Sequence, residues 1–198
     1  MKILIATKNK HKLIELERIL IPMGFDVLSV NDLENGLSDV IEDGTTFEEN
    51  ALIKARSGCK ETGFITVADD SGICVDALNG APGIYSARYA GEPCDDQANN
   101  DKLLSELKGV PYEKRTGRYV SAIACVFPDG REFTVRGECE GIIAEKEEGG
   151  NGFGYDPLFI SKIGCFGIVS AEEKDKISHR FNSLAAFKKE LPKYLEEK

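Results

Sequence analysis

The sequence predicts an α/β fold, organised as a single domain over residues 1–198 around a mixed sheet. Three observations support this class. At the N-terminus an apolar run, an amphipathic stretch and a second apolar run follow one another, which is the order of a parallel β-α-β unit. Further along, two apolar runs flank Pro128-Asp129-Gly130, an arrangement typical of a hairpin. A length of 198 residues suits one domain.

In the N-terminal half, hydrophobic spacing and start and stop residues place the elements. Four apolar residues lie on one face of the first expected helix, and Gly24 can end it. Thr46-Phe47-Glu48-Glu49 matches a capping box, which predicts the start of the second helix. In order, we expect a strand over 2–6, a helix over 10–23, a strand over 25–30, a polar loop over 31–44, a helix over 46–60 and a strand over 64–68, which residues 73–78 can continue beyond an acidic turn.

The elements of the C-terminal half are predicted in the same way. Leu103, Leu104 and Leu107 give the third expected helix an inward face. Ser170-Ala171-Glu172-Glu173 is a second capping box, and residues 149–154 form a glycine-rich loop. In order, we expect a helix over 95–107, strands over 119–127 and 131–139 and a last helix over 181–191.

Charge and composition exclude several classes of protein. The net charge is −9, and the clustered basic residues form two short groups, within 8–12 and 174–180. An acidic protein with small basic spots suits a compact anionic ligand, not a nucleic acid polymer. No apolar run approaches the roughly 20 residues of a membrane-spanning helix, so no membrane partner is expected. The six cysteines lack the spacing of a zinc site, which favours reduced thiols and a cytoplasmic protein.

The clearest chemical signal is Asp69-Asp70-Ser71-Gly72. The two carboxylates follow an apolar strand, and strand ends are where open α/β sheets build their sites. Adjacent acids repel each other, so we expect a use for their charge, as ligands of a divalent cation or as activators of water. A solvated turn is the alternative that these four residues leave open.

Two segments of the N-terminal half can complete such a site. Thr7-Lys8-Asn9-Lys10-His11-Lys12 lies between a strand and a helix, where backbone N–H groups and ammonium groups attract phosphate. A capped helix with solvated lysines is the alternative. Glu42 can join Asp70 as a ligand of Mg²⁺ or be an ordinary loop acid. Asn50 and Lys54 lie four residues apart on a helix, so both can face this site or both can face solvent.

Two segments of the C-terminal half suit a flat ligand that forms hydrogen bonds. In Gly152-Phe153-Gly154-Tyr155-Asp156-Pro157, small residues let a ring approach the backbone and stack on the phenylalanine, and the aspartate offers an acceptor. The alternative is a tight turn with a core aromatic. Lys174, His179 and Arg180 can donate to carbonyl oxygens such as the 6-keto group of a purine.

Together these segments resemble the inosine triphosphate pyrophosphatase-like family of HAM1/RdgB-type nucleoside triphosphate pyrophosphatases. The resemblance lies in the order and spacing of six motifs that span nearly the whole chain. They are Thr7-x-Asn9-x-x-Lys12, Glu42-x-Gly44-x-Thr46-Phe47-x-x-Asn50-Ala51-x-x-Lys54-Ala55, Ala68-Asp69-Asp70-Ser71-Gly72, residues 80–89, Gly152-Phe153-Gly154-Tyr155-Asp156-Pro157-x-Phe159 and Lys174-x-x-x-Ser178-His179-Arg180. The resemblance implies an elongated, two-lobed ITPase-like fold with a mixed sheet and a central cleft, and it implies a homodimer.

The resemblance also implies an activity and the residues that carry it. Deaminated purine nucleoside triphosphates (ITP, dITP and XTP) are expected to be hydrolysed to the monophosphate and pyrophosphate with Mg²⁺ as cofactor, which cleans the nucleotide pool. Asp70 is implied as proton acceptor and Mg²⁺ ligand, and Glu42 as the second ligand. The implied substrate contacts are Thr7, Lys8, Asn9, Lys10, His11, Lys12, Ser71, Phe153, Gly154, Tyr155, Asp156, Lys174, His179 and Arg180.

Two other functions stay open on the sequence alone. A related Maf-type pyrophosphatase would act on other nucleotides, and a nucleotide-binding regulatory module would bind without turnover. The acids Asp69, Asp70 and Glu42 favour catalysis, because a protein that only binds a polyanion gains nothing from bare carboxylates.

Overall fold

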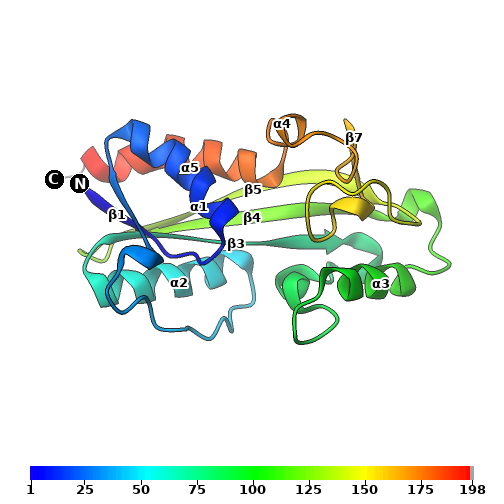
Figure 1. Ribbon diagram of the computed structural model, residues 1–198, viewed down its shortest axis with the longest axis horizontal. Helices are drawn as coiled ribbons and strands as arrows, with labels where there is room; N and C mark the ends of the chain where they lie inside the picture. Colours follow the sequence, from blue (N-terminus) through cyan, green and yellow to red (C-terminus); the bar gives the residue numbers. More distant parts are fainter. Residues whose placement is uncertain (197–198) are drawn as a thin grey trace. The chain divides into compact units, whose positions relative to one another are not determined.

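The computed structural model describes residues 1–196, of which His11 and Glu196 are described by their backbone alone. Within this range the strands are β1 (Lys2–Ile5), β2 (Asp26–Ser29), β3 (Ile65–Val75), β4 (Thr116–Val126), β5 (Glu132–Ile143), β6 (Phe159–Ser161) and β7 (Gly164–Cys165). They form one sheet in the order β2-β1-β3-β4-β5-β6-β7 (Figure 1). Pairing is parallel between β1 and both of its neighbours and antiparallel on both sides of β6. The predicted α/β class and mixed sheet are therefore confirmed.

The helices begin and end largely where the sequence predicts. They are α1 (Lys10–Leu20), α2 (Phe47–Thr62), α3 (Asp96–Glu106), α4 (Ala171–Lys174) and α5 (His179–Glu196). The side chains of Thr46 and Ser170 accept from the third residue of α2 and α4, as the two capping boxes predict. Gly24, with a φ of 86°, ends the short 3-10 turn that follows α1. Across residues 1–196, each helix is too short or too polar to cross a membrane.

The predicted turn at Asp69-Asp70-Ser71-Gly72 is wrong. These residues lie inside β3, which runs without interruption. Gly72 serves close packing instead of a turn, because a Cβ atom there would lie 2.4 Å from Ser86 Oγ and 2.6 Å from Gly83 O. Glycine in a strand interior marks a close backbone approach as readily as a bend.

The chain divides into two compact units. Unit 1 comprises Met1–Asp70, Ala122–Arg136 and the chain from Ser183 onward, and unit 2 comprises Ser71–Ser121 and Gly137–Asn182. The strands β3, β4 and β5 contribute residues to both units.

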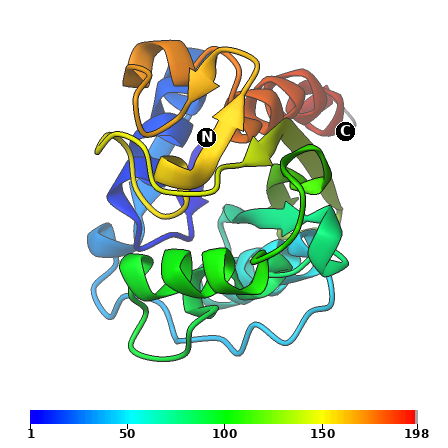
Figure 2. The ribbon, with the colours of Figure 1, turned by 90° about the vertical axis from the view of Figure 1, so that its right-hand side faces the viewer.

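In unit 1 the sheet carries helices on both faces (Figure 1). Along β3, Ile65 and Val67 pack with α1 and α5, whereas Ala68 packs with small residues of α2. Successive side chains of a strand point to opposite faces, so odd and even positions of β3 belong to different layers. In unit 2, Leu103 of α3 and Leu107, which follows the helix, pack in a core with aromatic residues of β4 and β6, and Figure 2 shows α3 in green.

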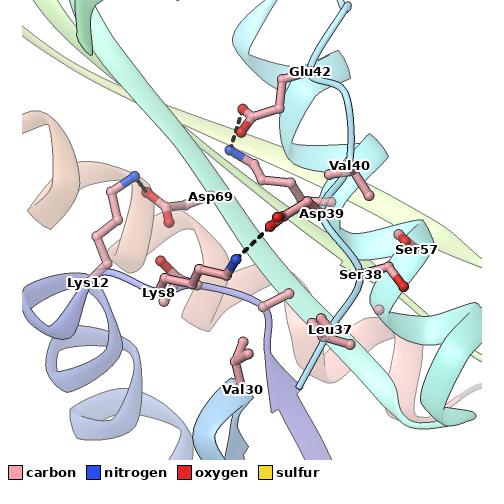
Figure 3. Close-up of a pocket in the computed structure, with 14 residues that line it drawn as sticks. Lys8, Lys12, Val30, Leu37, Ser38, Asp39, Val40, Glu42, Ser57 and Asp69 are labelled. Carbon is pink, nitrogen blue, oxygen red and sulfur yellow. Dashed lines mark hydrogen bonds and ion pairs between the residues drawn. The ribbon is translucent and has the colours of Figure 1, made fainter. Parts of the chain in front are cut away.

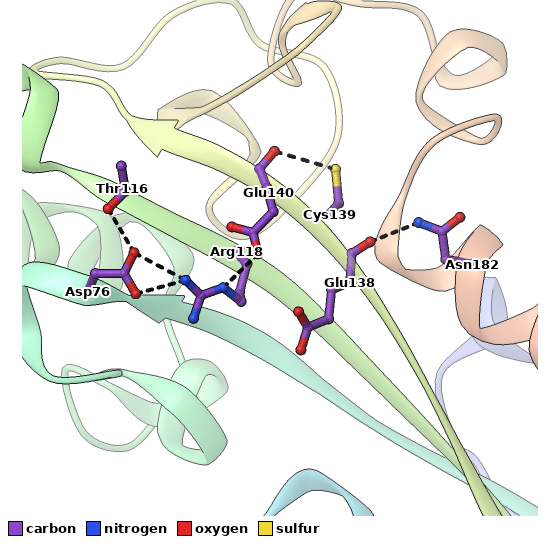
Figure 4. A network of polar contacts seen from close by, with 7 residues as sticks. All are labelled: Asp76, Thr116, Arg118, Glu138, Cys139, Glu140 and Asn182. Carbon is purple, nitrogen blue, oxygen red and sulfur yellow. Dashed lines mark hydrogen bonds and ion pairs between the residues drawn. The ribbon is translucent and has the colours of Figure 1, made fainter.

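A polar network lies on the surface of unit 2 (Figure 4). The Arg118 guanidinium of β4 donates to Asp76 at 2.8 Å and to Glu140 of β5 at 3.0 Å. Thr116 Oγ1 donates to the same Asp76 carboxylate at 2.7 Å. Such exposed ion pairs each contribute up to about 1 kcal/mol, so the network fixes side chains more than it stabilises the unit.

Candidate active site

The acidic pair of β3 lies just beyond the carboxyl end of its parallel neighbour β1. The register between the two strands runs to Ile5 opposite Val67, and Ala6 N donates to Val67 O at 2.8 Å. Asp69 and Asp70 follow directly. Parallel sheets gather polar groups beyond the carboxyl ends of their strands. The acidic pair thus lies beyond the carboxyl end of β1 but not at the end of β3, and its role as a site stays a prediction.

Asp69 and Asp70 meet lysines of different helices. They are consecutive in an extended strand, so their side chains point to opposite faces. Asp69 shares the face that packs on α1, and it pairs there with Lys12 at 2.7 Å (Figure 3). Asp70 shares the face that packs on α2, where its Oδ1 lies 3.5 Å from the ammonium of Lys54.

A second polar side chain of α2 also holds Asp70. Asn50 Nδ2 donates to Asp70 Oδ2 at 3.3 Å, and Lys54 donates to Glu42 Oε2 at 2.8 Å. Sequence spacing left open whether Asn50 and Lys54 face a site or solvent, and the structure turns both toward Asp70. The i, i+4 spacing was the available signal, and only the packed sheet shows which face is inward.

Burial and charge shift the ionisation of this group of residues. Burial raises the pKa of Asp70 more than the neighbouring charges of Lys54 and Lys12 lower it. The pKa of Lys54 is raised above its ordinary value. Burial alone would lower it, but the nearby carboxylates of Asp70 and Glu42 stabilise the ammonium more than burial destabilises it. The result is a carboxyl group with a raised pKa beside the positive charge of Lys54.

A pocket of about 240 Å³ opens beside these groups (Figure 3). Its charged lining comprises Lys8, Lys12, Asp39, Glu42, Lys54 and Asp69. At the pocket, the exposed side chains of Lys8 and Asp39 form an ion pair at 2.5 Å. Lysines and carboxylates from four separate segments therefore share one cavity within unit 1, a setting suited to a polyanion with a bound cation.

The residues from Thr7 to Lys12 lie in different surroundings. Thr7, Lys8 and Lys12 line the pocket. Asn9 precedes α1, and its Oδ1 accepts from Lys12 N at 3.4 Å, so the alternative of helix capping holds for this residue. Lys10 is exposed, and the side chain of His11 lies outside the described part of the structure.

The donor set fits a cation of the magnesium type. Glu42 and Asp70 both approach the ammonium of Lys54, so hard oxygen donors already converge on one positive charge. Mg²⁺ uses one or two protein carboxylates and takes its other ligands from water and phosphate. Among the described residues, no group of three or more His, Cys, Asp or Glu side chains forms a protein cage for a metal. The arrangement suits a cation that arrives with a phosphate ligand.

In unit 2 the segment around Phe153 is organised by a buried carboxylate. Asp156 is 1% exposed, and its Oδ2 accepts from Lys174 Nζ at 2.5 Å and from Phe153 N at 3.0 Å. Its Oδ1 accepts from the Tyr119 hydroxyl at 3.2 Å. Gly152 makes room for this carboxylate, because a Cβ atom would lie 2.0 Å from Asp156 Oδ2. Asp156 therefore holds the segment together, and its direct contact with a ligand stays a prediction.

The aromatic residues of this segment face different surroundings. Phe153 is 49% exposed, and the Lys174 ammonium lies 5.1 Å from the centre of its ring. Tyr155 is buried, and its hydroxyl donates to Ser86 O at 2.8 Å. Gly154 is fixed by its backbone, since its N–H donates to Asp96 and its carbonyl accepts from Asn100. Phe153 is thus the ring of this segment that a flat ligand can reach.

The remaining predicted residues lie at the start of α5 and in β3. His179 is buried and stacks on Tyr119 with ring centres 4.7 Å apart, while Arg180 is half-buried. Ser178 caps α5 by accepting from Phe181 N at 3.1 Å. Ser71 is half-buried in the part of β3 that belongs to unit 2. Sequence reasoning missed Tyr119, because nothing local marks a strand tyrosine as the partner of a distant aspartate.

Comparison with known proteins places this geometry in a family. The family model described as "Ham1 family" matches residues 3–190. The chain is 50% identical to the dITP/XTP pyrophosphatase of Desulforamulus reducens over 186 residues, which cover 93% of this chain and 92% of that protein. It is 48% identical to the dITP/XTP pyrophosphatase of Geobacter sulfurreducens over 192 residues, 96% of each chain.

Solved structures agree with the sequence comparison. The Ham1 protein of Staphylococcus aureus superposes with a TM-score of 0.91 at 38% identity, covering 98% of this chain and 100% of that one. The dITP/XTP pyrophosphatase of Mycobacterium abscessus superposes with a TM-score of 0.83 at 48% identity, covering 94% and 98%. The chain therefore belongs to the Ham1 family.

Proposed function

We propose that this protein hydrolyses deaminated purine nucleoside triphosphates (ITP, dITP and XTP) to the monophosphate and pyrophosphate. Family membership supports hydrolysis of this substrate class, since its close relatives are named dITP/XTP pyrophosphatases. The single observation that carries the chemistry is the acidic pair of β3: Asp70 is partly buried and lies 3.5 Å from Lys54, while its neighbour Asp69 pairs with Lys12 and lines the same pocket as the predicted phosphate loop.

In unit 1, Asp70 accepts the proton of the attacking water as the bond between the α and β phosphates breaks. Burial raises the pKa of Asp70, which makes its carboxylate a better base near neutrality. Lys8, Lys12 and Lys54 offset the charge of the phosphates and of the leaving pyrophosphate. Glu42 and Asp70 would hold Mg²⁺, which when bound neutralises phosphate charge and orients water.

In unit 2, Phe153 stacks on the purine, and Lys174, His179 and Arg180 donate to its 6-keto oxygen. Adenine carries an amino group there, which would leave these donors unpaired, and a site of that kind rejects the wrong ligand by about 10⁴-fold. Asp156 keeps Lys174 and the backbone of Phe153 in place. Gly154 and Tyr155 shape the segment, and Ser71 and the loop from Thr7 to Lys12 contact the rest of the substrate.

Three further properties belong to the proposal. The cofactor is Mg²⁺, the active protein is a homodimer, and the enzyme works in the cytoplasm on free nucleotides. The acidic composition and the small basic spots support a small-molecule substrate instead of a nucleic acid polymer. Light scattering on the purified protein tests the dimer directly.

Pyrophosphate release from a panel of triphosphates tests the function. The panel contains ITP, dITP, XTP and the four common nucleotides, each with Mg²⁺ and with excess EDTA. We expect rapid release from the deaminated purines that stops with EDTA. Release from the common nucleotides alone would support a Maf-type enzyme, and binding without any release would support a regulatory module.

A further inference from the structure

We infer that Asn50 is a positioning residue that fixes the Asp70 carboxylate relative to the loop that carries Glu42. The inference rests on the proposed function, because it names the side chain that aligns the two acids of that site. Asn50 closes the first turn of α2 and is 1% exposed, although its side chain is polar. A buried amide needs partners for both of its ends.

Both ends of the Asn50 amide are used, and each reaches a different part of the site. Its Nδ2 donates to Asp70 Oδ2 at 3.3 Å, and its Oδ1 accepts from Gly44 N at 2.9 Å. Gly44 lies two residues after Glu42. One side chain thus bonds the strand that bears one acid and the loop that bears the other.

The packing around Gly44 shows that this loop is drawn close to the amide. A Cβ atom on Gly44 would lie 2.7 Å from Asn50 Oδ1 and 2.8 Å from Glu49 Cβ. No side chain fits there without moving the loop or the helix. The hydrogen bond therefore requires glycine at position 44, which lets the backbone come close, and a side-chain acceptor at position 50, which asparagine supplies.

The two oxygens of Asp70 are held by residues one helical turn apart. Lys54 lies near Oδ1 and Asn50 donates to Oδ2, so α2 fixes the plane of the carboxylate as well as its place. Lys54 supplies charge, whereas Asn50 supplies only direction. An aspartate at position 50 would still accept from Gly44 N, but it would bring a repelling charge to Asp70. Asparagine both accepts from Gly44 N and donates to Asp70 without adding charge.

Two substitutions separate the bonds of Asn50. Asn50→Asp keeps an acceptor for Gly44 and loses the donor to Asp70, while Asn50→Ala loses both. The matched control is Asn99→Ala in unit 2, because Asn99 is similarly buried and also uses both ends of its amide, accepting from Ala90 N and donating to Ala87 O.

The first measurement is steady-state hydrolysis of dITP at saturating Mg²⁺. Both Asn50 variants should lose about 10- to 100-fold in kcat, the usual cost of removing a partner that orients a reactive group, with KM little changed. Asn99→Ala should keep both constants. An Asn50→Asp protein that melts normally and keeps the wild-type kcat overturns the inference.

The second measurement uses the metal-free protein without nucleotide. Amide hydrogen exchange at Gly44 should accelerate in Asn50→Ala and stay protected in Asn50→Asp and Asn99→Ala. The ¹³C shift of the Asp70 carboxyl should move in both Asn50 variants. If the wild type hydrolyses no nucleotide, the proposed function fails, and the exchange and shift data still judge the Asn50 bonds. The proposed Asn50 bonds are contradicted if Gly44 exchanges no faster in Asn50→Ala than in wild type. If Asn50→Ala does not fold, an unchanged Asp70 carboxyl shift in Asn50→Asp contradicts them instead.

Discussion

The charged clusters of the two units use their ion pairs differently. Among the described residues of unit 1, three carboxylates (Glu42, Asp69 and Asp70) share two ammonium groups, those of Lys12 and Lys54. In unit 2, the single carboxylate of Asp156 takes hydrogen bonds from an ammonium, a hydroxyl and a backbone N–H. The first cluster gathers several carboxylates, as a cation site requires, whereas the second has one carboxylate surrounded by donors. The cluster of unit 1 is therefore suited to binding a charged group, and the cluster of unit 2 to fixing the positions of the residues around Asp156.

The largest effect is expected from Asp70→Asn. Asparagine has nearly the same volume but cannot accept the proton of water, so kcat should fall by about 10²- to 10⁴-fold while the fold is retained. Pyrophosphate release and a thermal melt measure the two properties. Asp76→Asn, which alters only the surface network of unit 2, is the control. Normal turnover by Asp70→Asn would remove Asp70 from the mechanism.

The second prediction compares how much the lysine of each charged cluster contributes to the stability of the fold. Lys174→Met leaves Asp156 buried without its cationic partner, which should cost about 3–5 kcal/mol in the free energy of unfolding. Lys54→Met should cost less, because Glu42 and Asp70 are more accessible to water than Asp156. Urea unfolding followed by circular dichroism compares the two variants. Equal losses would show that the clusters do not differ in this way.

Phe153→Ala tests the role of the half-exposed ring. Stacking of a base on an aromatic side chain is worth about 1–3 kcal/mol, so KM for dITP should rise roughly 5- to 150-fold with kcat and stability nearly unchanged. Phe181→Ala is the matched control, because Phe181 belongs to the same unit and is 47% exposed. A similar rise in KM for both variants would argue against stacking on Phe153.

The smallest effect concerns pH. Burial raises the pKa of Asp70 in the folded protein, so its ionised form opposes folding above that pKa, and the penalty disappears as pH falls toward the unfolded value. Asp70→Asn should thus be more stable than wild type at pH 7, with a difference that shrinks in acid.

Glu132 provides the opposite case in unit 1. A hydrogen bond from Arg56 lowers its pKa, so it stabilises the fold at neutral pH and loses that contribution as pH falls through its folded pKa. Because the pair is partly exposed, Glu132→Gln should cost less than about 1 kcal/mol at pH 7. Urea unfolding between pH 3 and pH 7 measures the free energy of unfolding of Asp70→Asn and Glu132→Gln relative to wild type. The two differences should have opposite signs at pH 7, and differences of the same sign would contradict the prediction.

Local chemistry was enough to predict much of the fold. The boxes at Thr46 and Ser170 mark helix starts because a capping side chain bonds a backbone only three residues away. The turn predicted over residues 69–72 was wrong, since Gly72 is required by its close contacts with the distant residues Gly83 and Ser86 and not by a bend. The presence of Asp70 and Lys12 in one candidate site followed from motifs. The inward turn of Asn50 and the saturation of Asp156 depend on distant partners, which spacing along the chain does not reveal.

The alternation of Asp69 and Asp70 across β3 has a consequence for how this chain can change. Adding or deleting one residue between Ile65 and Ala68 would exchange the faces of every later side chain in the strand, so the second acid would turn toward α1 and away from Lys54. The same amino acids would then be present with no working base. Insertions within residues 31–36, which precede the pocket-lining part of the loop, avoid that exchange, so length variation among functional variants should accumulate there while this strand stays constant in length.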